Sequence, residues 1–229
     1  MRYGYLFLMA IGLILVGWWM MVQSDDRGDT RTIILSRQEQ EWLLQNSRRQ
    51  LEAKLSGGAG IEVNQEDLSH TLKQEAACFV TLNKDGALRG CIVDSLHAHE
   101  PIYQNVLRNV VLAATADPRF SPVTPDELDR ITIEISILSR PRQLEYSDPQ
   151  RLLRKITPGK DGVILTTTHG TSTYLPQVWE FFSDPAEFLS RLCEKQGAPP
   201  NCWQEAPPPK IETYRAFHFS EEKRGLRSD

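Results

Sequence analysis

The residues with the clearest chemical content lie in the run Leu88-Arg89-Gly90-Cys91-Ile92, where a guanidinium and a thiol are two positions apart. Side chains alternate along a strand, so a strand through this run would place Arg89 and Cys91 on one face. A nearby positive charge lowers the pKa of a thiol and favours the thiolate, which is the nucleophilic and redox-active form. Gly90 between them leaves space for another backbone or for a ligand. Cys91 is therefore a candidate nucleophile, and a small buried hydrophobic residue is the structural alternative.

This run belongs to a predicted β-hairpin. An apolar segment, 77–82, precedes it, and the turn-forming residues 83–86 lie between the two. If all four turn residues form the loop, Cys78 lies opposite Cys91, and an oxidising compartment would allow a disulfide. A two-residue loop instead places Val80 opposite Cys91 and separates the thiols.

The four cysteines of this 229-residue chain are too few for a disulfide scaffold. Cys193 and Cys202 flank a Pro-Pro turn and form a second candidate pair. The sequence leaves open whether either pair forms a disulfide, because disulfide formation depends on the compartment.

Three further charged residues could either meet a ligand or stabilise the fold. Arg119, in the run DPRF after a predicted helix, lies either at a binding site or at a plain helix end. Glu134, in the alternating run ITIEISIL, lies on the face opposite the isoleucines and is either solvated or paired with a cation such as Arg89. Lys160, in the turn GKDG, is either a turn residue or a partner for an anion.

Several other chemistries lack their sequence signals. The chain has no phosphate-binding loop, no dinucleotide fingerprint and no Gly-x-Ser-x-Gly elbow. His97-x-His99 precedes a predicted helix without an obvious third ligand, so no metal site is predicted. With 26 basic and 30 acidic residues the net charge is −4, which argues against a nucleic-acid partner.

The elements that must position these residues alternate between helices and hairpins without a strict βαβ rhythm. This order predicts an α+β fold with a mainly antiparallel sheet and flanking helices. Ser36-Arg37-Gln38-Glu39 is a capping box that begins the first helix of the domain. Longer helices are predicted at 36–56, 101–116 and 185–197, shorter ones after 124 and 148, and strands at 77–82, 87–93, 131–138, 163–168, 171–175 and 211–219.

The first 24 residues form a separate segment. Residues 4–22 carry no charge, and a 19-residue helix spans about 28 Å, close to the thickness of a bilayer core. Arg2 before this run and acidic residues after it predict a single-pass signal anchor with a cytoplasmic N-terminus and an extracytoplasmic, periplasmic domain. A signal peptide cleaved near Ser24, which would give a secreted protein, and a buried core helix are the alternatives. Residues 25–35 are then a tether, 36–220 the folded domain and 221–229 a charged tail.

The sequence resembles the AMMECR (AMME syndrome candidate gene) domain family. The hallmark of the family, Leu-Arg-Gly-Cys-Ile-Gly, is matched at positions 88–93, except that Val93 stands in place of the last glycine. The β-branched side chain of Val93 leaves less space for a ligand to approach the motif. Further matches occur in the expected chain order: FVTL before the hallmark, and DPRF, EISIL, GKDG, LPQV and residues 188–193 after it. The family positions found in this chain are Arg89, Gly90, Cys91, Arg119, Glu134, Lys160 and Gln177.

The resemblance implies two lobes with a cleft near the hallmark, but neither a settled reaction nor a cofactor. Cys91, Arg89 and Glu134 then become candidate catalytic residues, and Gly90, Arg119, Lys160 and Gln177 candidate ligand-binding residues. Similarity to partners of Memo-like proteins and radical-SAM enzymes implies a partner from such a pathway. The resulting hypothesis is a membrane-tethered domain that binds a small anionic or carbonyl-bearing ligand. A non-enzymatic binding or scaffold module, with Cys91 structural or disulfide-bonded, is the alternative.

Overall fold

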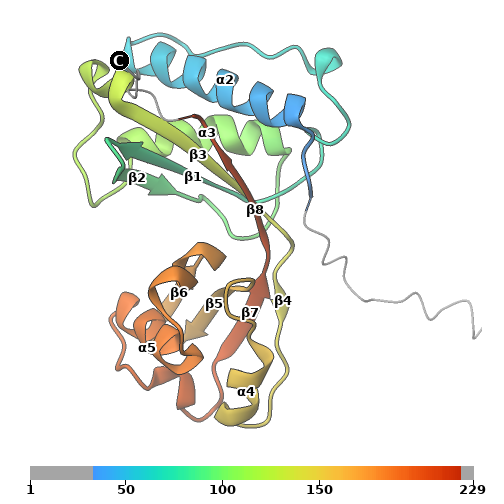
Figure 1. The fold of residues 1–229 in the computed structure, drawn as a ribbon, viewed down its shortest axis with the longest axis vertical. Coiled ribbons are helices and arrows are strands. Elements are labelled where there is room, and N and C mark those ends of the chain that lie inside the picture. Colours follow the sequence, from blue (N-terminus) through green and yellow to red (C-terminus); the bar gives the residue numbers. More distant parts are fainter. Residues whose placement is uncertain (1–32, 223–229) are drawn as a thin grey trace, which may run out of the picture.

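The computed structural model describes residues 33–222, and these fold into two lobes that each contain a four-stranded sheet (Figure 1). All the strand pairs in both sheets are antiparallel. The predicted α+β class with two lobes is therefore confirmed.

The upper lobe carries two helices on one face of its sheet. The strand order is β2-β1-β3-β8, and the contacts of α2 and α3 with one another and with β1 and β3 place both helices on the same side. Its elements are α2 (Arg37–Leu55), the short 3-10 helix η1 (Gln65–Asp67), β1 (Cys78–Lys84), β2 (Ala87–Ile92), α3 (Ile102–Thr115), the 3-10 helix η2 (Pro125–Arg130), β3 (Ile131–Leu138) and β8 (Ala216–Ser220).

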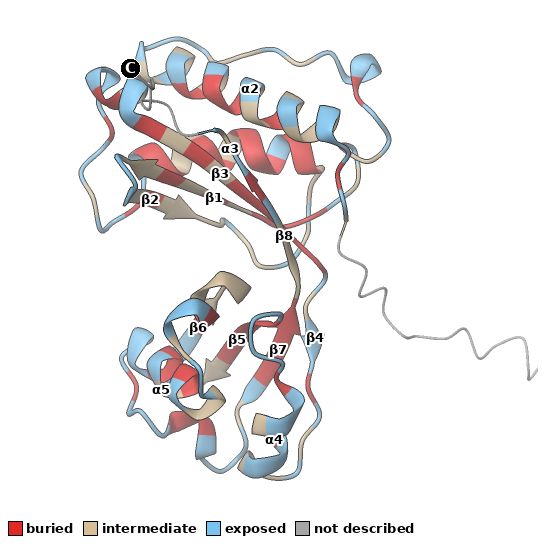
Figure 2. Cartoon of the chain, in the orientation of Figure 1, coloured by how far each residue is buried: buried red, intermediate tan, exposed pale blue. Residues whose placement is uncertain are grey.

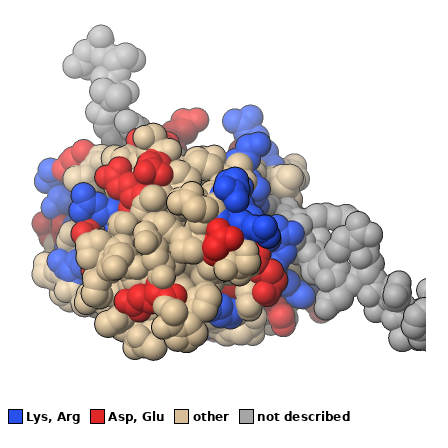
Figure 3. Space-filling model, turned by 90° about the horizontal axis from the view of Figure 1, so that it is seen from below, with Lys and Arg blue, Asp and Glu red and all other residues tan. Residues whose placement is uncertain are grey.

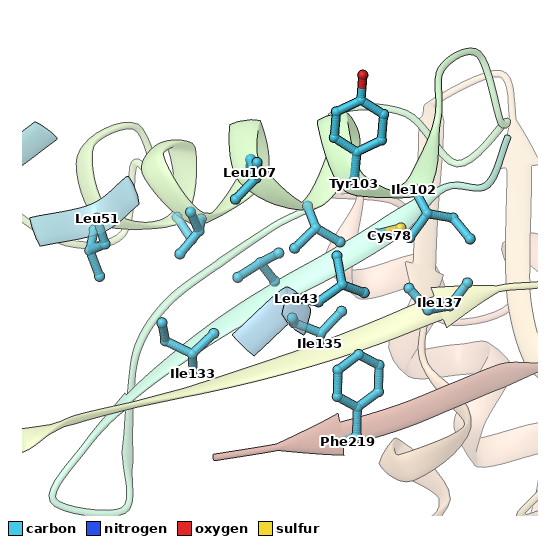
Figure 4. Close-up of a cluster of buried hydrophobic side chains, with 14 of the residues drawn as sticks. Leu43, Leu51, Cys78, Ile102, Tyr103, Leu107, Ile133, Ile135, Ile137 and Phe219 are labelled. Carbon is cyan, nitrogen blue, oxygen red and sulfur yellow. The ribbon is translucent and has the colours of Figure 1, made fainter. Parts of the chain in front are cut away.

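The core of this lobe follows from the sequence pattern. Every second residue of β3 from Ile131 to Ile137 is fully buried against the helices (Figure 4). The predicted capping box forms, because the Ser36 hydroxyl accepts from the Glu39 amide at 3.3 Å and the Glu39 carboxylate accepts from the Ser36 amide at 2.7 Å. Figure 2 shows that the buried residues concentrate where helices and sheet meet.

The lower lobe is smaller and its sheet has the order β4-β7-β5-β6. Trp179 stacks on Phe188 with ring centroids 3.8 Å apart, and a disulfide joins Cys193 to Cys202 inside this core. On the face seen in Figure 3, acidic and basic side chains lie among uncharged ones. The elements are β4 (Arg142–Gln143), α4 (Pro149–Lys155), β5 (Gly162–Thr167), β6 (Gly170–Tyr174), η3 (Pro176–Phe181), α5 (Pro185–Lys195), η4 (Cys202–Gln204) and β7 (Lys210–Tyr214).

The two lobes are joined by chain segments that pass from one sheet to the other. The prediction of a single strand at 211–219 is wrong, because β7 belongs to the lower sheet and β8 to the upper one. Between them the Arg215 amide donates to the Ser139 hydroxyl at 2.9 Å, and the Arg215 carbonyl accepts from the Ser139 amide at 2.9 Å. Around this crossing an apolar cluster with members in both lobes, including Leu138, Ile164 and Tyr214, fills the junction.

The predicted membrane segment, 4–22, lies outside the described residues. Among residues 33–222 no helix has both the length and the apolar character needed to cross a bilayer.

Candidate functional site

The hairpin that carries Cys91 has the predicted two-residue loop, since Lys84 pairs with Ala87, but its register shifts by one residue before Cys91. Thr81 lies opposite Cys91 and Asn83 opposite Leu88, with an irregularity between them that leaves Arg89 without a partner across the strands. Arg89 is thus the extra residue of a β-bulge. The predicted pairings of Cys91 with Cys78 or Val80 are wrong, and both Cys78 and Cys91 are free thiols.

The bulge directs the Arg89 side chain to a buried carboxylate. Its Nε and Nη2 each lie 3.0 Å from an oxygen of Glu127, and its Nη1 donates to the Ser121 carbonyl at 2.9 Å. Lys84 binds the same carboxylate at 2.7 Å. These hydrogen bonds, with those from Arg89 as the largest cause, hold the pKa of Glu127 well below its ordinary value. Arg89 therefore anchors the hairpin to η2, and its expected contacts with Cys91 and Glu134 are not formed within the described residues.

Gly90 lies in close contact with another part of the chain, as expected from its position between Arg89 and Cys91. The contact is with the backbone of α3 rather than with a ligand. A Cβ atom at this position would lie 2.0 Å from the carbonyl oxygen of Ala113 in α3. Only glycine allows the hairpin to pack this closely on the helix.

Cys91 itself faces away from the helices, toward the lower lobe. Its residue is half-buried, and its Sγ accepts a hydrogen bond from the Thr81 hydroxyl at 3.3 Å. Its amide donates to the Asp117 carboxylate at 2.9 Å. Asp117 also holds Arg119 through a contact of 2.6 Å, and an Nη2 donor of Arg119 reaches the Cys91 carbonyl at 3.4 Å. The run DPRF thus places a guanidinium beside Cys91.

A second cation approaches the thiol from the lower lobe. Lys195, at the end of α5, lies 4.7 Å from the centroid of the Tyr174 ring and donates to the Thr173 carbonyl at 2.8 Å. Burial raises the pKa of the Cys91 thiol, while the Thr81 hydrogen bond and the charges of Arg119 and Lys195 lower it. The net direction is upward, so the resting group at neutral pH is the thiol.

The remaining predicted residues are distributed over other places. Glu134 does lie on the face opposite the isoleucines, two strands away from Cys91 in the row that also contains Thr81. The described residues place no ion pair on Glu134. Lys160 and Gln177 line one hollow of about 750 Å³ beside β8. The structure therefore brings Cys91 together with Arg119, and Lys160 together with Gln177, but does not unite the two pairs.

The histidine pair of the loop after β2 also separates. His99 lies with Asp94 and Glu100 in a group whose potential ligand atoms are within 4.8 Å of one another, while His97 faces Glu212 of the lower lobe at 3.8 Å. Arg108 forms ion pairs with both acids of the group, at 2.6 Å to Glu100. A protein cation thus already neutralises these carboxylates.

Comparison with known proteins agrees with this architecture. The AMMECR1 family profile matches residues 44–219. This chain belongs to the AMMECR1 family. It is 38% identical over 188 residues to a protein of Thermococcus gammatolerans, covering 80% of this chain and 90% of the relative. A protein of Methanothermobacter thermautotrophicus is 36% identical over 189 residues, covering 82% and 97%. The crystal structure of an uncharacterised protein from Pyrococcus horikoshii matches with a TM-score of 0.76 and 33% identity, covering 83% of this chain and 95% of that one.

In this AMMECR1 domain, three residues near Cys91 are not indicated by any pattern in the sequence. Thr81 is visible as a strand residue, but its role depends on the bulge register. Asp117 is the first residue of the run DPRF and is only 5% exposed. Its carboxylate binds both the Cys91 amide and the Arg119 guanidinium. Lys195 is remote in sequence and could be found only from the contact of the two lobes.

Proposed function

We propose that this AMMECR1 domain binds a small anionic, carbonyl-bearing ligand at the junction of its lobes, and that the Cys91 thiol adds to the ligand. The observation that carries the proposal is geometric: the Arg119 guanidinium reaches the Cys91 carbonyl at 3.4 Å, and Asp117 holds both residues in place. Lys195, from the lower lobe, adds a second positive charge that lowers the pKa of the Cys91 thiol. A carboxylate of the ligand would be attracted by these cations. In the addition, sulfur forms a bond to the carbonyl carbon, the π pair moves to oxygen, and the thiol proton passes to that oxygen.

The test is alkylation of the native full-length chain with iodoacetamide, followed by mass spectrometry. Cys91 is expected to be labelled, while Cys78, which is fully buried, serves as the internal control. Glyoxylate, a small anionic aldehyde, is expected to slow the labelling of Cys91, and Arg119→Met to weaken this protection. Absence of native labelling, or labelling unaffected by glyoxylate, contradicts the proposal.

A matched variant separates site protection from simple consumption of thiols. Leu88 lies on the same hairpin and is 43% exposed. In the double variant Cys91→Ser/Leu88→Cys, the new thiol lies on the exposed hairpin tip, and glyoxylate should leave its labelling nearly unchanged.

The second candidate function is a binding or scaffold module in which Cys91 is structural. The observation in its favour is that burial raises the pKa of Cys91, since a buried thiol is often inert. It predicts that Cys91→Ser lowers the free energy of unfolding by about 1–3 kcal/mol. The first proposal predicts loss of the alkylation signal with nearly unchanged stability.

We further propose that residues 4–22 tether the domain to a membrane, with the domain on the extracytoplasmic side. The uncharged run supports this placement, and so does the Cys193–Cys202 disulfide, because disulfides persist in oxidising compartments. The same placement disfavours a radical-SAM partner, whose iron–sulfur cluster needs a reducing environment. Alkaline extraction of membranes is expected to leave the chain in the pellet, and non-reducing mass spectrometry to find the Cys193–Cys202 bridge. Recovery in the soluble fraction with four free thiols would exclude the placement.

A further inference from the structure

The hollow beside β8 is separate from the Cys91 site. Cys91 lies on β2, whereas His218, which lines the hollow, lies on β8, and these strands are the two opposite edges of the upper sheet. Neighbouring strands are spaced by about 4.8 Å, so roughly 14 Å of sheet separates them. The volume of about 750 Å³ falls in the range of small-molecule sites.

A buried carboxylate holds the walls of this hollow in place. Asp161, 6% exposed, accepts from the Thr157 amide at 2.6 Å and pairs with Arg215 at 3.1 Å. Its backbone carbonyl accepts from the indole nitrogen of Trp179 at 2.7 Å. Asp161 thereby connects three parts of the hollow: the loop that carries Lys160, Arg215 at the crossing between the two sheets, and the aromatic side chain of Trp179. The hollow is organised before any ligand binds, which reduces the entropic cost of binding.

The lining combines three kinds of group. Lys160, Arg215 and His218 bring basic side chains, and among the described residues Lys160 has no carboxylate partner. Trp179 and Phe182 supply an apolar wall. The Oε1 atom of Gln177 is buried and receives no hydrogen bond in the described part of the chain, which is a costly state for a polar atom. A ligand that donates to this oxygen would remove that cost.

We infer that this hollow is a second ligand site, for a small molecule with an anionic group, a planar apolar body and an N–H or O–H donor. The anionic group meets Lys160 and the planar body lies against Trp179 and Phe182. The donor meets Gln177 Oε1 after the Gln177 side chain turns toward the hollow. Glu180 also lines the hollow and disfavours doubly charged anions. Binding in this hollow does not require the Cys91 thiol.

The probe for the test is 1-anilinonaphthalene-8-sulfonate, which has an anionic sulfonate, an aromatic body and an N–H donor. Its fluorescence on titration with the full chain reports binding. Lys160→Met is expected to weaken binding about tenfold, and Gln177→Leu about fivefold. Lys73→Met, at an exposed turn in the other lobe, is the matched control and should leave binding unchanged.

A second probe tests the contribution of the Gln177 Oε1 acceptor separately. Naphthalene-1-sulfonate lacks the N–H group, so its binding, measured by calorimetry, should fall in Lys160→Met and not in Gln177→Leu. Thermal unfolding verifies that each variant is folded. Absence of binding by the unmodified chain, or equal binding by all variants, overturns the inference. Cys91→Ser should bind the probe like the unmodified chain, so failure here and failure of the Cys91 proposal are distinguishable.

Discussion

The two sides of the β1–β2 hairpin differ in what their residues do, although both sides belong to one short motif. On the helix side, Arg89 and Gly90 join the hairpin to Glu127 and to the backbone of α3. On the junction side, Cys91 faces the lower lobe beside Arg119. A run of neighbouring residues therefore does not have to form one site. Arg89 is explained by its hydrogen bonds to Glu127 and Gly90 by its close packing on α3, whereas Cys91 also lies where charges of both lobes act on its thiol.

The largest effect expected on the helix side comes from Gly90→Ala. The added methyl group would overlap the Ala113 carbonyl oxygen, and neither backbone can move without disturbing the core. We expect a loss of more than about 3 kcal/mol in the free energy of unfolding, measured by urea denaturation. Gly86→Ala is the matched control: it meets no atom within 4 Å and strains only a positive φ of 85°, so its cost should be about 1 kcal/mol. Equal losses in the two variants would contradict the packing role of Gly90.

The next effect concerns the carboxylate that receives Arg89. Glu127→Gln weakens its bonds to Arg89 and Lys84, and we expect a loss of about 2 kcal/mol at pH 7. The folded pKa of Glu127 lies below its ordinary value of 4.5, so its contribution is complete above pH 4.5 and declines as the pH falls toward the folded pKa. The stability difference between the two proteins should therefore shrink between pH 5 and pH 3 in urea titrations. A difference that is constant over this range would show that the charge of Glu127 is unimportant.

The sequence predicted the elements of this fold better than their contacts. The capping box at Ser36 and the alternation of β3 are local patterns, and both are found where expected. The bulge at Arg89 depends on Glu127, which is 38 residues away, and so no local pattern indicates it. The break between β7 and β8 likewise involves a distant residue, because Arg215 between these strands is hydrogen-bonded to Ser139, which directly follows β3.

The candidate site was predictable only in part for the same reason. Cys91 and Arg119 were found from their residue types and motif positions. The carboxylate that joins them, Asp117, looked like a helix stop, since Asp-Pro commonly ends helices. Lys195 lies near Cys91 only because the two lobes pack against each other. No spacing or motif in a single sequence predicts how two lobes pack.

A smaller effect compares the two free thiols. Cys78 is fully buried beside Ile102 and Ile137, and its thiol donates to the Ala76 carbonyl at 3.7 Å (Figure 4). Cys78→Ser buries a more polar hydroxyl at this position and should cost about 2 kcal/mol. Cys91→Ser, on the junction side, should cost less than about 1 kcal/mol, because the position is only half-buried and a serine can keep the contact with Thr81. Both values come from urea denaturation under identical conditions. A cost at Cys91 as large as that at Cys78 would assign Cys91 to packing as well.

The smallest effect tests whether the lower lobe acts on Cys91 through charge. Lys195→Met removes a positive charge that lowers the pKa of the thiol, so the pH profile of iodoacetamide alkylation should shift to higher pH. At pH 8 the rate should fall about threefold, because a smaller fraction of the thiol is ionised without the Lys195 charge. Above the pKa of both proteins the two rates should converge, because the thiolate is then fully formed in each. A rate that stays lower even at this plateau indicates changed access to the junction, and a profile that does not shift indicates that Lys195 is too well solvated to influence the thiol. Only a shift with an unchanged plateau identifies the junction side as a region where both lobes set the reactivity of Cys91.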